Sequence, residues 1–483
     1  MRRLTLAAPF ALLLAACAAS STVSPPSPGA PAAPSAPSAG GRNDAFLDTL
    51  QRRTFGFFWD LQDPGTHLIP DRWPTRSFAS VAAVGFGLAG YPVGVERGYV
   101  TRAQGAERTL ATLRWLWATP QGSAAAGMTG YKGFFYHFLD MRTGRRFERV
   151  ELSTIDSALL FGGVLVCREY FDGAGADERE IRALADSLYL RADWKWVTVR
   201  APKVSMGWSP EEGFHSYDWN GMNEAMLLYV LALGSPTHPA DSTAWSAWTS
   251  TYTWGTFQGQ ENVQFAPLFG HQYSQMFIDF RGIRDAYMRG RGIDYFENSR
   301  RATLSQRAYA IANPGGWAGY GPDVWGLTAS DGPVDGTFTV NGRQRAFQTY
   351  TARGAALGEI KDDGTLAPTA AGGSIPFAPE VALSALKEMR RRYGDHLFRQ
   401  YGFVDAFNPT LTDSTFRVQM GKIVPGVGWF DDDYLGIDQG PILLQAENYR
   451  SELIWRMMRK NPYVIRGLRR AGFTGGWLDG APR

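Results

Sequence analysis

The sequence predicts an all-α protein, and an (α/α)6 toroid with small β-hairpin insertions is the fold that fits it best. Apolar residues recur with helical spacing in about a dozen segments, mostly in pairs separated by Gly- and Pro-rich loops. The helical part has roughly 440 residues, which is long for one domain unless the chain closes into a ring or barrel. Aromatic residues make up 13% of the chain and can fill a large core. A plain helical solenoid is the alternative.

The N-terminal residues resemble an export signal followed by a tether. Two arginines precede an apolar run over residues 4–16, which is too short to span a bilayer as a helix. Residues 14–17 (LAAC) have the form of a lipobox, so we expect residues 1–17 to be a lipoprotein signal peptide and Cys17 to be acylated. The alternative is an ordinary signal peptide cut nearby. Residues 18–43, almost all Ala, Ser, Pro and Gly, predict a flexible tether.

The expected location follows from this segment. Ala18 and Ala19 follow the cysteine, where an Asp would favour retention in the inner membrane. We therefore expect an exported protein anchored by lipid to the outer membrane, on its periplasmic or surface face. Residues 44–483 would then form one large domain held off the membrane.

The helical body is expected to begin at residue 44. The helix at 44–61 places Phe and Leu side chains on one face, and the helix at 78–91 is rich in small residues, which favours close packing. The helix at 101–118 opens with Thr101 and Gln104, spaced as a capping box. Further helices are expected from the same periodicity at 153–171, 176–190, 222–233, 272–288, 294–311, 379–393, 395–401, 440–459 and 463–470.

Two β-hairpins are expected as insertions between helices. Segments 134–140 and 145–152 flank a Thr-Gly pair, and segments 337–340 and 344–350 flank Asn341-Gly342. Asn-Gly is the strongest signal for a two-residue hairpin turn. Strands and helices do not alternate along the sequence, so a parallel sheet is not predicted.

Composition excludes several classes of function. The formal net charge of +3 includes the arginines of the signal, so the mature domain is nearly neutral, and no basic stripe indicates nucleic acid. Cys167 lies in an apolar run and is expected to be a buried thiol. The six histidines show no metal-type spacing, and the acids at 431–433 lack the alternation of an EF-hand. We therefore expect no metal and no cofactor, and a neutral molecule as the partner.

Three loop segments, 208–220, 316–326 and 428–434, are rich in both aromatic and acidic residues. Aromatic rings can stack on the apolar face of a pyranose while polar groups bind its hydroxyls. The alternative is that these rings plug the rim of the toroid. As a set, they favour a cleft that binds sugar.

Hydrolysis of a glycosidic bond requires two carboxyl groups, a protonated acid and a base or nucleophile. Asp156 lies at the start of an apolar helix, although Ser153 and Asp156 also have the spacing of a capping box. Glu224 lies in a first turn directly after the aromatic loop, where the helix dipole also favours an acid. The reserve candidates are Glu151, Glu211, Glu212, Glu380 and Glu447.

Six segments together resemble the glycoamylase-like family of secreted bacterial proteins. They are residues 54–59 (TFGFFW), 151–160 (ELSTIDSALL), 217–225 (YDWNGMNEA), 269–273 (FGHQY), 319–331 (GYGPDVWGLTASD) and 438–441 (DQGP). The family includes the endo-β-1,2-glucanases of glycoside hydrolase family 144, which are (α/α)6 toroids. The resemblance implies hydrolysis of a β-1,2-glucan, most readily with inversion and without a cofactor. It leaves open a toroidal hydrolase or transglycosylase that acts on another glucan.

The resemblance also implies roles for individual residues. It assigns Glu224 as the general acid and Asp156 as the base or the residue that holds the water, with Glu151 as the rival of Asp156. We expect a monomer that contacts the membrane through its lipid alone; a surface lipoprotein that binds glycan without cleaving it is the second hypothesis. The residues expected to bind substrate are Glu151, Trp208, Glu212, Tyr217, Trp219, Asn223, His271, Gln272 and Trp325.

Overall fold

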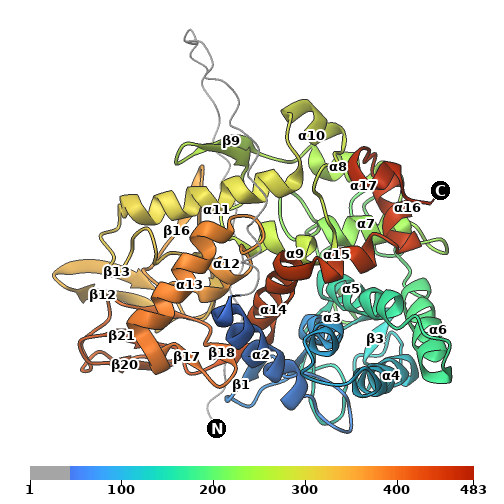
Figure 1. The fold of residues 1–483 in the computed structure, drawn as a ribbon, viewed down its shortest axis with the longest axis horizontal. Helices are drawn as coiled ribbons and strands as arrows, with labels where there is room; N and C mark the ends of the chain where they lie inside the picture. The colour runs from blue at the N-terminus through green and yellow to red at the C-terminus, as the bar shows by residue number, and fades with distance from the viewer. Residues whose placement is uncertain (1–43, 483) are drawn as a thin grey trace.

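The computed structural model describes residues 44–482, so Cys17, the signal-like segment and the tether lie outside the described residues. Within residues 44–482, long helices alternate with short antiparallel strand pairs (Figure 1). The predicted helical fold class with hairpin insertions is therefore confirmed. No helix in this part of the chain is both long and apolar enough to cross a membrane.

An inner ring of helices surrounds the centre of the molecule (Figure 1). Most neighbours along the ring pack closely against each other, and the last helix packs against the first. Gln272 donates hydrogen bonds of 2.8 Å to the carbonyl of Ala370 and to Ser374 Oγ, and so joins α9 to α12. The inner helices are α3 (Val81–Glu96), α5 (Thr154–Tyr170), α7 (Met226–Gly234), α9 (Phe269–Phe277), α12 (Pro368–Gly372) and α14 (Gly436–Ser451).

An outer set of helices covers this ring, and the chain alternates between the two sets in the manner of an (α/α)6 toroid. The outer helices bury one face against the ring and expose the other, which explains their amphipathic sequences. The outer helices are α2 (Ala45–Asp60), α4 (Arg102–Ala118), α6 (Ala176–Leu190), α8 (Ala244–Thr249), α11 (Tyr295–Ala312) and α13 (Pro379–Tyr393), with α16 (Pro462–Arg470) against α7.

The small residues of α3 serve close packing, as the sequence predicts. A Cβ atom on Gly85 would lie 2.5 Å from the carbonyl oxygen of Leu159, and one on Gly163 would lie 1.9 Å from the carbonyl oxygen of Gly85. The backbones of α3 and α5 therefore approach each other where neither helix carries a side chain. Larger residues at these two glycines would push the inner helices apart.

Three expected helices are interrupted in the structure. The helix expected at 272–288 divides into α9 and α10 (Ala286–Arg291), because Asp285 caps a new helix by accepting from Met288 N–H. The helix expected at 440–459 begins earlier, at Gly436, and breaks at Glu452, whose φ of 59° is left-handed, before α15 (Leu453–Met458). The helix expected at 395–401 is a single 3-10 turn followed by a strand pair that turns at residues 400–401.

The hairpin at Asn341-Gly342 is confirmed. Strands β12 (Gly336–Val340) and β13 (Arg343–Phe347) pair, and both turn residues have positive φ, 51° and 72°. The other expected hairpin is reduced to two isolated bridges, Leu139 to Arg146 and Tyr136 to Leu152. Its strands find partners elsewhere in the chain, since β5 (Phe138–Leu139) pairs with β2 (Ala79–Ser80) and β6 (Leu152–Ser153) pairs with β7 (Gly207–Ser209).

Short strand pairs hold the N-terminal ends of the inner helices. β2 leads directly into α3, β6 into α5, and β22 (Tyr434–Leu435) into α14, and each of these strands is paired with a distant segment. The residues that open these helices are thereby fixed in place. The remaining elements are β1 (Arg72–Trp73), β3 (Gly130–Tyr131), β4 (Phe134–Phe135), β8 (Gly213–Phe214), β9 (Trp254–Phe257), β10 (Gln260–Val263), β11 (Ala329–Ser330), β14 (Thr351–Ala352), β15 (Gly354–Ala356), β16 (Glu359–Lys361), β17 (Phe398–Arg399), β18 (Gly402–Phe403), β19 (Phe407–Asn408), β20 (Lys422–Val424), β21 (Gly428–Phe430), the 3-10 turn η1 (Gly394–His396) and α17 (Gly476–Asp479).

Candidate active site

Carboxyl groups gather at the N-terminal ends of the inner helices. Asp156 lies in the first turn of α5, Glu224 precedes α7, and Asp438 lies in the first turn of α14. Asp156 is close enough to raise the pKa of Glu224 by charge repulsion. Tyr273 of α9 in turn feels the charges of both Asp438 and Glu224. Helix starts that are distant in sequence therefore contribute acids to one site.

Glu224 lies on a turn that its neighbours hold firmly. Ser274 Oγ donates to the carbonyl of Glu224 at 2.6 Å and accepts from Leu227 N–H at 2.8 Å. Asn223 Oδ1 accepts from Ala225 N–H at 3.0 Å. Desolvation by the surrounding protein raises the pKa of Glu224 to about 7, and Asp156 adds to the shift. A carboxyl that stays protonated near neutral pH can serve as a general acid.

Asp156 shares His137 with Glu151. His137 Nδ1 lies 2.8 Å from a Glu151 carboxylate oxygen, and its Nε2 lies 3.6 Å from Asp156 Oδ2. Although burial opposes a charged ring, the two carboxylates raise the pKa of His137 to about 9. Burial raises the pKa of Asp156, and the imidazolium opposes that shift. A cationic His137 favours the ionised form that a base requires.

The sequence also allowed Ser153 and Asp156 to form a helix cap, and the backbone of Asp156 does take part in one. Ser153 Oγ caps α5 by accepting from Asp156 N–H at 3.2 Å. The carboxylate of Asp156 accepts a short hydrogen bond from the same hydroxyl and lies beside His137. The residue therefore belongs both to the helix cap and to the group of carboxyls.

A cavity of about 250 Å³ opens beside this group. Arg149, Glu151, Ser209, Glu211, Glu212 and His215 line it. Arg146 fixes the Glu211 loop through an ion pair of 2.8 Å. Two of the predicted substrate-binding residues, Glu151 and Glu212, therefore lie around one hollow.

The aromatic residues predicted to bind substrate differ in how far they are exposed. The half-buried ring of Trp208 packs against Tyr131 and Trp196, with ring centroids 5.1 and 5.5 Å away. Tyr217 is 57% exposed, so its ring is free to meet a ligand. Tyr217 remains a prediction for stacking, whereas Trp208 also supports the loop.

Four of the predicted substrate-binding residues are buried in the core instead. Trp325 is fully buried, and Trp219 donates to Thr154 Oγ1 at 3.0 Å. His271 Nε2 lies 3.2 Å from a carbonyl oxygen, and desolvation lowers its pKa to about 4. Gln272 joins α9 to α12, as described above. All four side chains have interior neighbours, and their contact with a sugar stays a prediction. Asn223 is also buried and shapes the Glu224 turn.

A second cavity, of about 210 Å³, lies next to the segment that precedes Glu224. It is lined in part by Asn220, Gly221 and Met222, just before Glu224, and by Leu357 and Glu359. The turn that carries Glu224 is therefore adjacent in sequence to the lining of a hollow. Two hollows near one pair of carboxyls suit a chain-like ligand.

Sequence reasoning missed a second acidic group near this site. Arg72 Nη1 lies 2.7 Å from Asp331 and 3.8 Å from Asp433, and Arg72 Nε lies 3.3 Å from Asp71. Asp71 in turn raises the pKa of His137, so the two groups are neighbours. His137 and Arg72 sit in short strand-rich segments that give no sequence signal. The sequence did carry a signal for one nearby carboxyl, because Asp438 begins the DQGP segment at residues 438–441.

Comparisons with known proteins show the family to which the chain belongs. The model of the Glycoamylase family, described as "Putative glucoamylase", matches residues 216–462, half of the chain. The chain belongs to the Glycoamylase family. A solved structure from Bacteroides uniformis with the same description is 33% identical, covers 89% of this chain and 98% of its own, and has a TM-score of 0.75.

Two further relatives of the family have more specific descriptions. The endo-β-1,2-glucanase of Chitinophaga pinensis, solved with sophorotriose and glucose, is 27% identical over 92% of this chain and 100% of its own, with a TM-score of 0.76. An exo β-1,2-glucooligosaccharide sophorohydrolase of Parabacteroides distasonis is 28% identical over 89% of this chain. The chain spans 58% of the length of that relative. These matches agree with the toroid described above.

Proposed function

We propose that the protein is a glycoside hydrolase that cleaves β-1,2-glucan, most readily as an endo-acting, inverting enzyme. The observation that carries this proposal is the pair of carboxyls Glu224 and Asp156, which are close enough to interact and have different electrostatic surroundings. Glu151, linked to Asp156 through His137, lines an open cavity. The descriptions of its relatives from Chitinophaga pinensis and Parabacteroides distasonis supply the linkage.

In the proposed mechanism, Glu224 donates its proton to the glycosidic oxygen as the bond from that oxygen to C1 breaks. A water attacks C1 from the opposite face of the sugar and gives its proton to Asp156. His137, charged and shared with Glu151, keeps Asp156 ionised between turnovers. The charge that develops on the sugar ring in an oxocarbenium-like transition state is stabilised by the nearby carboxylates.

A panel of purified glucans tests the linkage. We expect new reducing ends from β-1,2-glucan, and at most one hundredth of that rate from β-1,3-glucan and from α-1,4-glucan at equal mass. A faster rate on either of the other glucans would refute the β-1,2 assignment. Binding of β-1,2-glucan without new reducing ends would support the non-catalytic glycan-binding protein instead.

We further propose that Cys17 carries the lipid anchor. In bacteria that express the full chain, a labelled fatty acid should enter the protein and the protein should sediment with membranes. Cys17→Ser should abolish both, and Cys167→Ala should abolish neither, because Cys167 is buried in the core. Labelling that survives in Cys17→Ser would refute the anchor.

A further inference from the structure

Three aspartates from separate loops meet in the interior. Asp331 follows β11, Asp405 lies between β18 and β19, and Asp431 follows β21. One carboxylate oxygen from each lies within 4.8 Å of the others. Each of the three residues is at most 2% exposed. Buried carboxylates at this separation repel one another strongly unless something neutralises them.

Each aspartate has one oxygen bound to an N–H donor. Arg72 binds Asp331 Oδ2, the Asp331 N–H binds Asp405 Oδ2, and the Asp432 N–H binds Asp431 Oδ1, all at 2.7 Å. The other oxygen of each aspartate, Asp331 Oδ1, Asp405 Oδ1 and Asp431 Oδ2, is buried and receives no hydrogen bond from an N–H or hydroxyl group. The carboxyls of Asp331 and Asp431, and those of Asp405 and Asp438, lie within hydrogen-bonding reach of each other. Buried polar atoms without a partner are rare in native proteins and often mark a bound ion or water.

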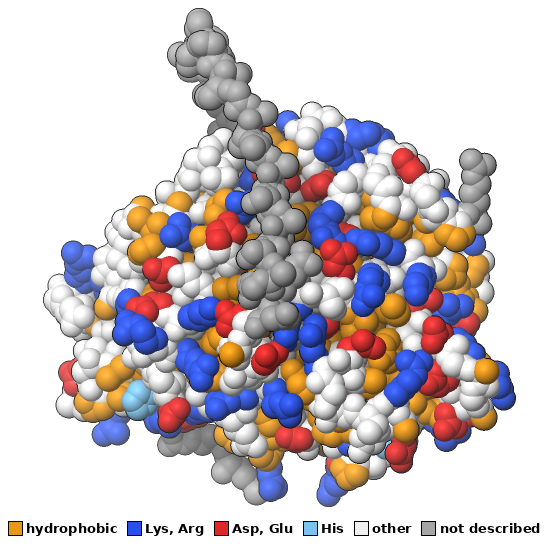
Figure 2. All heavy atoms as spheres, in the orientation of Figure 1, with side chains coloured by type: hydrophobic (Ala, Val, Ile, Leu, Met, Phe, Trp, Pro, Cys, Tyr) orange, Lys and Arg blue, Asp and Glu red, His pale blue; other side chains and the backbone are white. Residues whose placement is uncertain are grey.

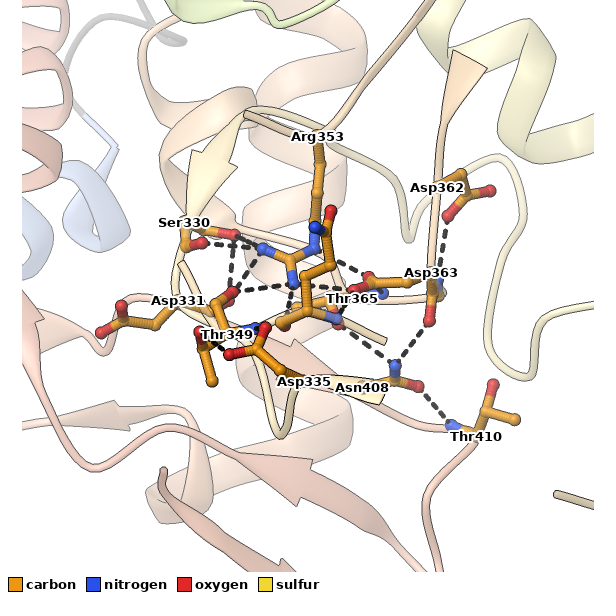
Figure 3. A network of polar contacts seen from close by, with 12 residues as sticks. Ser330, Asp331, Asp335, Thr349, Arg353, Asp362, Asp363, Thr365, Asn408 and Thr410 are labelled. Atoms are coloured by element: carbon orange, nitrogen blue, oxygen red, sulfur yellow. Dashed lines mark hydrogen bonds and ion pairs between the residues drawn. The ribbon is translucent and has the colours of Figure 1, made fainter. Parts of the chain in front are cut away.

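The neighbouring arginines do not balance this charge. Arg72 divides its charge among Asp331, Asp71 and Asp433. Arg353 lies close by, but its guanidinium binds Asp363 and backbone carbonyls, and the Asp331 carboxylate points away from it (Figure 3). Asp438 adds a further buried carboxyl next to Asp405. The group therefore carries more negative charge than its arginines compensate.

We propose that Asp331, Asp405 and Asp431 bind a calcium ion that ties their three loops together. Calcium takes carboxylate oxygens at about 2.3–2.6 Å, so oxygens up to about 5 Å apart can share one ion. Magnesium needs a tighter octahedron at about 2.0–2.1 Å, and zinc prefers nitrogen and sulfur ligands. The sequence expectation of no metal came from the spacing of the histidines and of the acids at 431–433; the proposed ligands are one of these acids and two distant ones.

Calorimetry on the unmodified protein tests the proposal first. After treatment with EDTA and its removal, titration with CaCl2 should show one site with a Kd of about 10⁻⁵ M or tighter, and 1 mM CaCl2 should raise Tm by at least about 2 °C. MgCl2 should bind at least tenfold more weakly. Absence of calcium binding, or tighter binding of magnesium, would overturn the proposal. If calcium does not bind, protons shared between the aspartates would be what neutralises their charge.

Two variants, each of which removes one negative charge, then locate the site. Asp431→Asn should weaken calcium binding at least tenfold and remove the rise in Tm. Asp432→Asn should keep both, because Asp432 is half-exposed and pairs with Lys422 and Arg399 instead of joining the three buried aspartates. Equal losses in the two variants would overturn the assignment. If Asp431→Asn does not fold, Asp405→Asn takes its place with the same expectation.

Discussion

Glu224→Gln should lower kcat on β-1,2-glucan by about 10²–10⁴-fold, the usual contribution of a general acid. Gln keeps the shape and hydrogen bonding of the side chain but cannot donate a proton to the glycosidic oxygen. The turn around it depends on backbone atoms and on Ser274, so the fold should persist. The measurement is kcat from the release of reducing ends, and KM should change little.

Stability supplies the control for this variant. The folded pKa of Glu224, about 7, lies above its ordinary value of 4.5, so ionising the buried carboxyl costs stability as pH rises from 4.5 through 7. Gln does not ionise, and at pH 8 the variant should therefore have a Tm at least equal to that of the unmodified protein. Glu388→Gln, on the outer helix α13, should keep full activity. Near-normal kcat in Glu224→Gln would refute the assignment of the acid.

The same pKa predicts the pH dependence of catalysis. Below pH 7 Glu224 is protonated and able to act as an acid, and above pH 7 kcat should fall about tenfold per pH unit. The acidic limb should lie above pH 3.8, because burial raises the pKa of Asp156. A profile of kcat between pH 4 and pH 9 measures both limbs. A flat profile from pH 6 to pH 9 would contradict the role of Glu224.

Arg353→Met should cost about 3–5 kcal/mol of stability, the largest structural effect that we predict. Arg353 is fully buried and joins Asp363 at 2.7 and 2.8 Å to the carbonyls of Ser330 and Gln348, both at 2.7 Å (Figure 3). Met fills similar space but leaves the Asp363 carboxylate and the carbonyls without their donors. Urea unfolding measures the loss of free energy.

Two controls separate the lost network from the loss of a positive charge. Arg343→Met changes an exposed residue of the nearby strand β13 and should cost less than about 1 kcal/mol. Arg353→Met with Asp363→Asn should recover part of the loss, because the unpaired buried charge is removed. Equal stability of Arg353→Met and Arg343→Met would show that the network adds nothing to the fold.

Charged side chains of both signs are mixed on the face of the molecule that Figure 2 shows. Blue and red side chains are interspersed over the face shown in Figure 2, which agrees with the nearly neutral composition and with a neutral ligand. The acids that matter to the site lie inside, at the helix starts, and not in a surface patch.

The sequence predicted the ring because helical periodicity is local and strong, and the resemblance pointed to Glu224 and Asp156 at helix starts. It could not predict the partners that give those carboxyls their properties. His137 reaches Asp156 through a strand pairing, and Arg72 reaches Asp331 across more than half the chain. Such contacts depend on how the ring closes and leave no local pattern.

The exposure of the aromatic residues could not be predicted for a related reason. Trp325 lies in a Gly-rich loop, as a sugar-binding ring would, yet it is fully buried. A loop can direct a ring inward or outward with the same residues, so composition alone does not distinguish a ligand surface from a rim packed with side chains. Tyr217, in a loop of similar composition, is exposed.

The most direct test of the central claim follows the digestion of purified β-1,2-glucan by ¹H NMR. The account predicts short β-1,2-linked oligosaccharides whose new reducing ends appear first as the α anomer, with no such products from Glu224→Gln. A first product in the β anomer would contradict inversion. No new reducing ends from the unmodified protein at any pH between 5 and 8 would contradict the hydrolase itself.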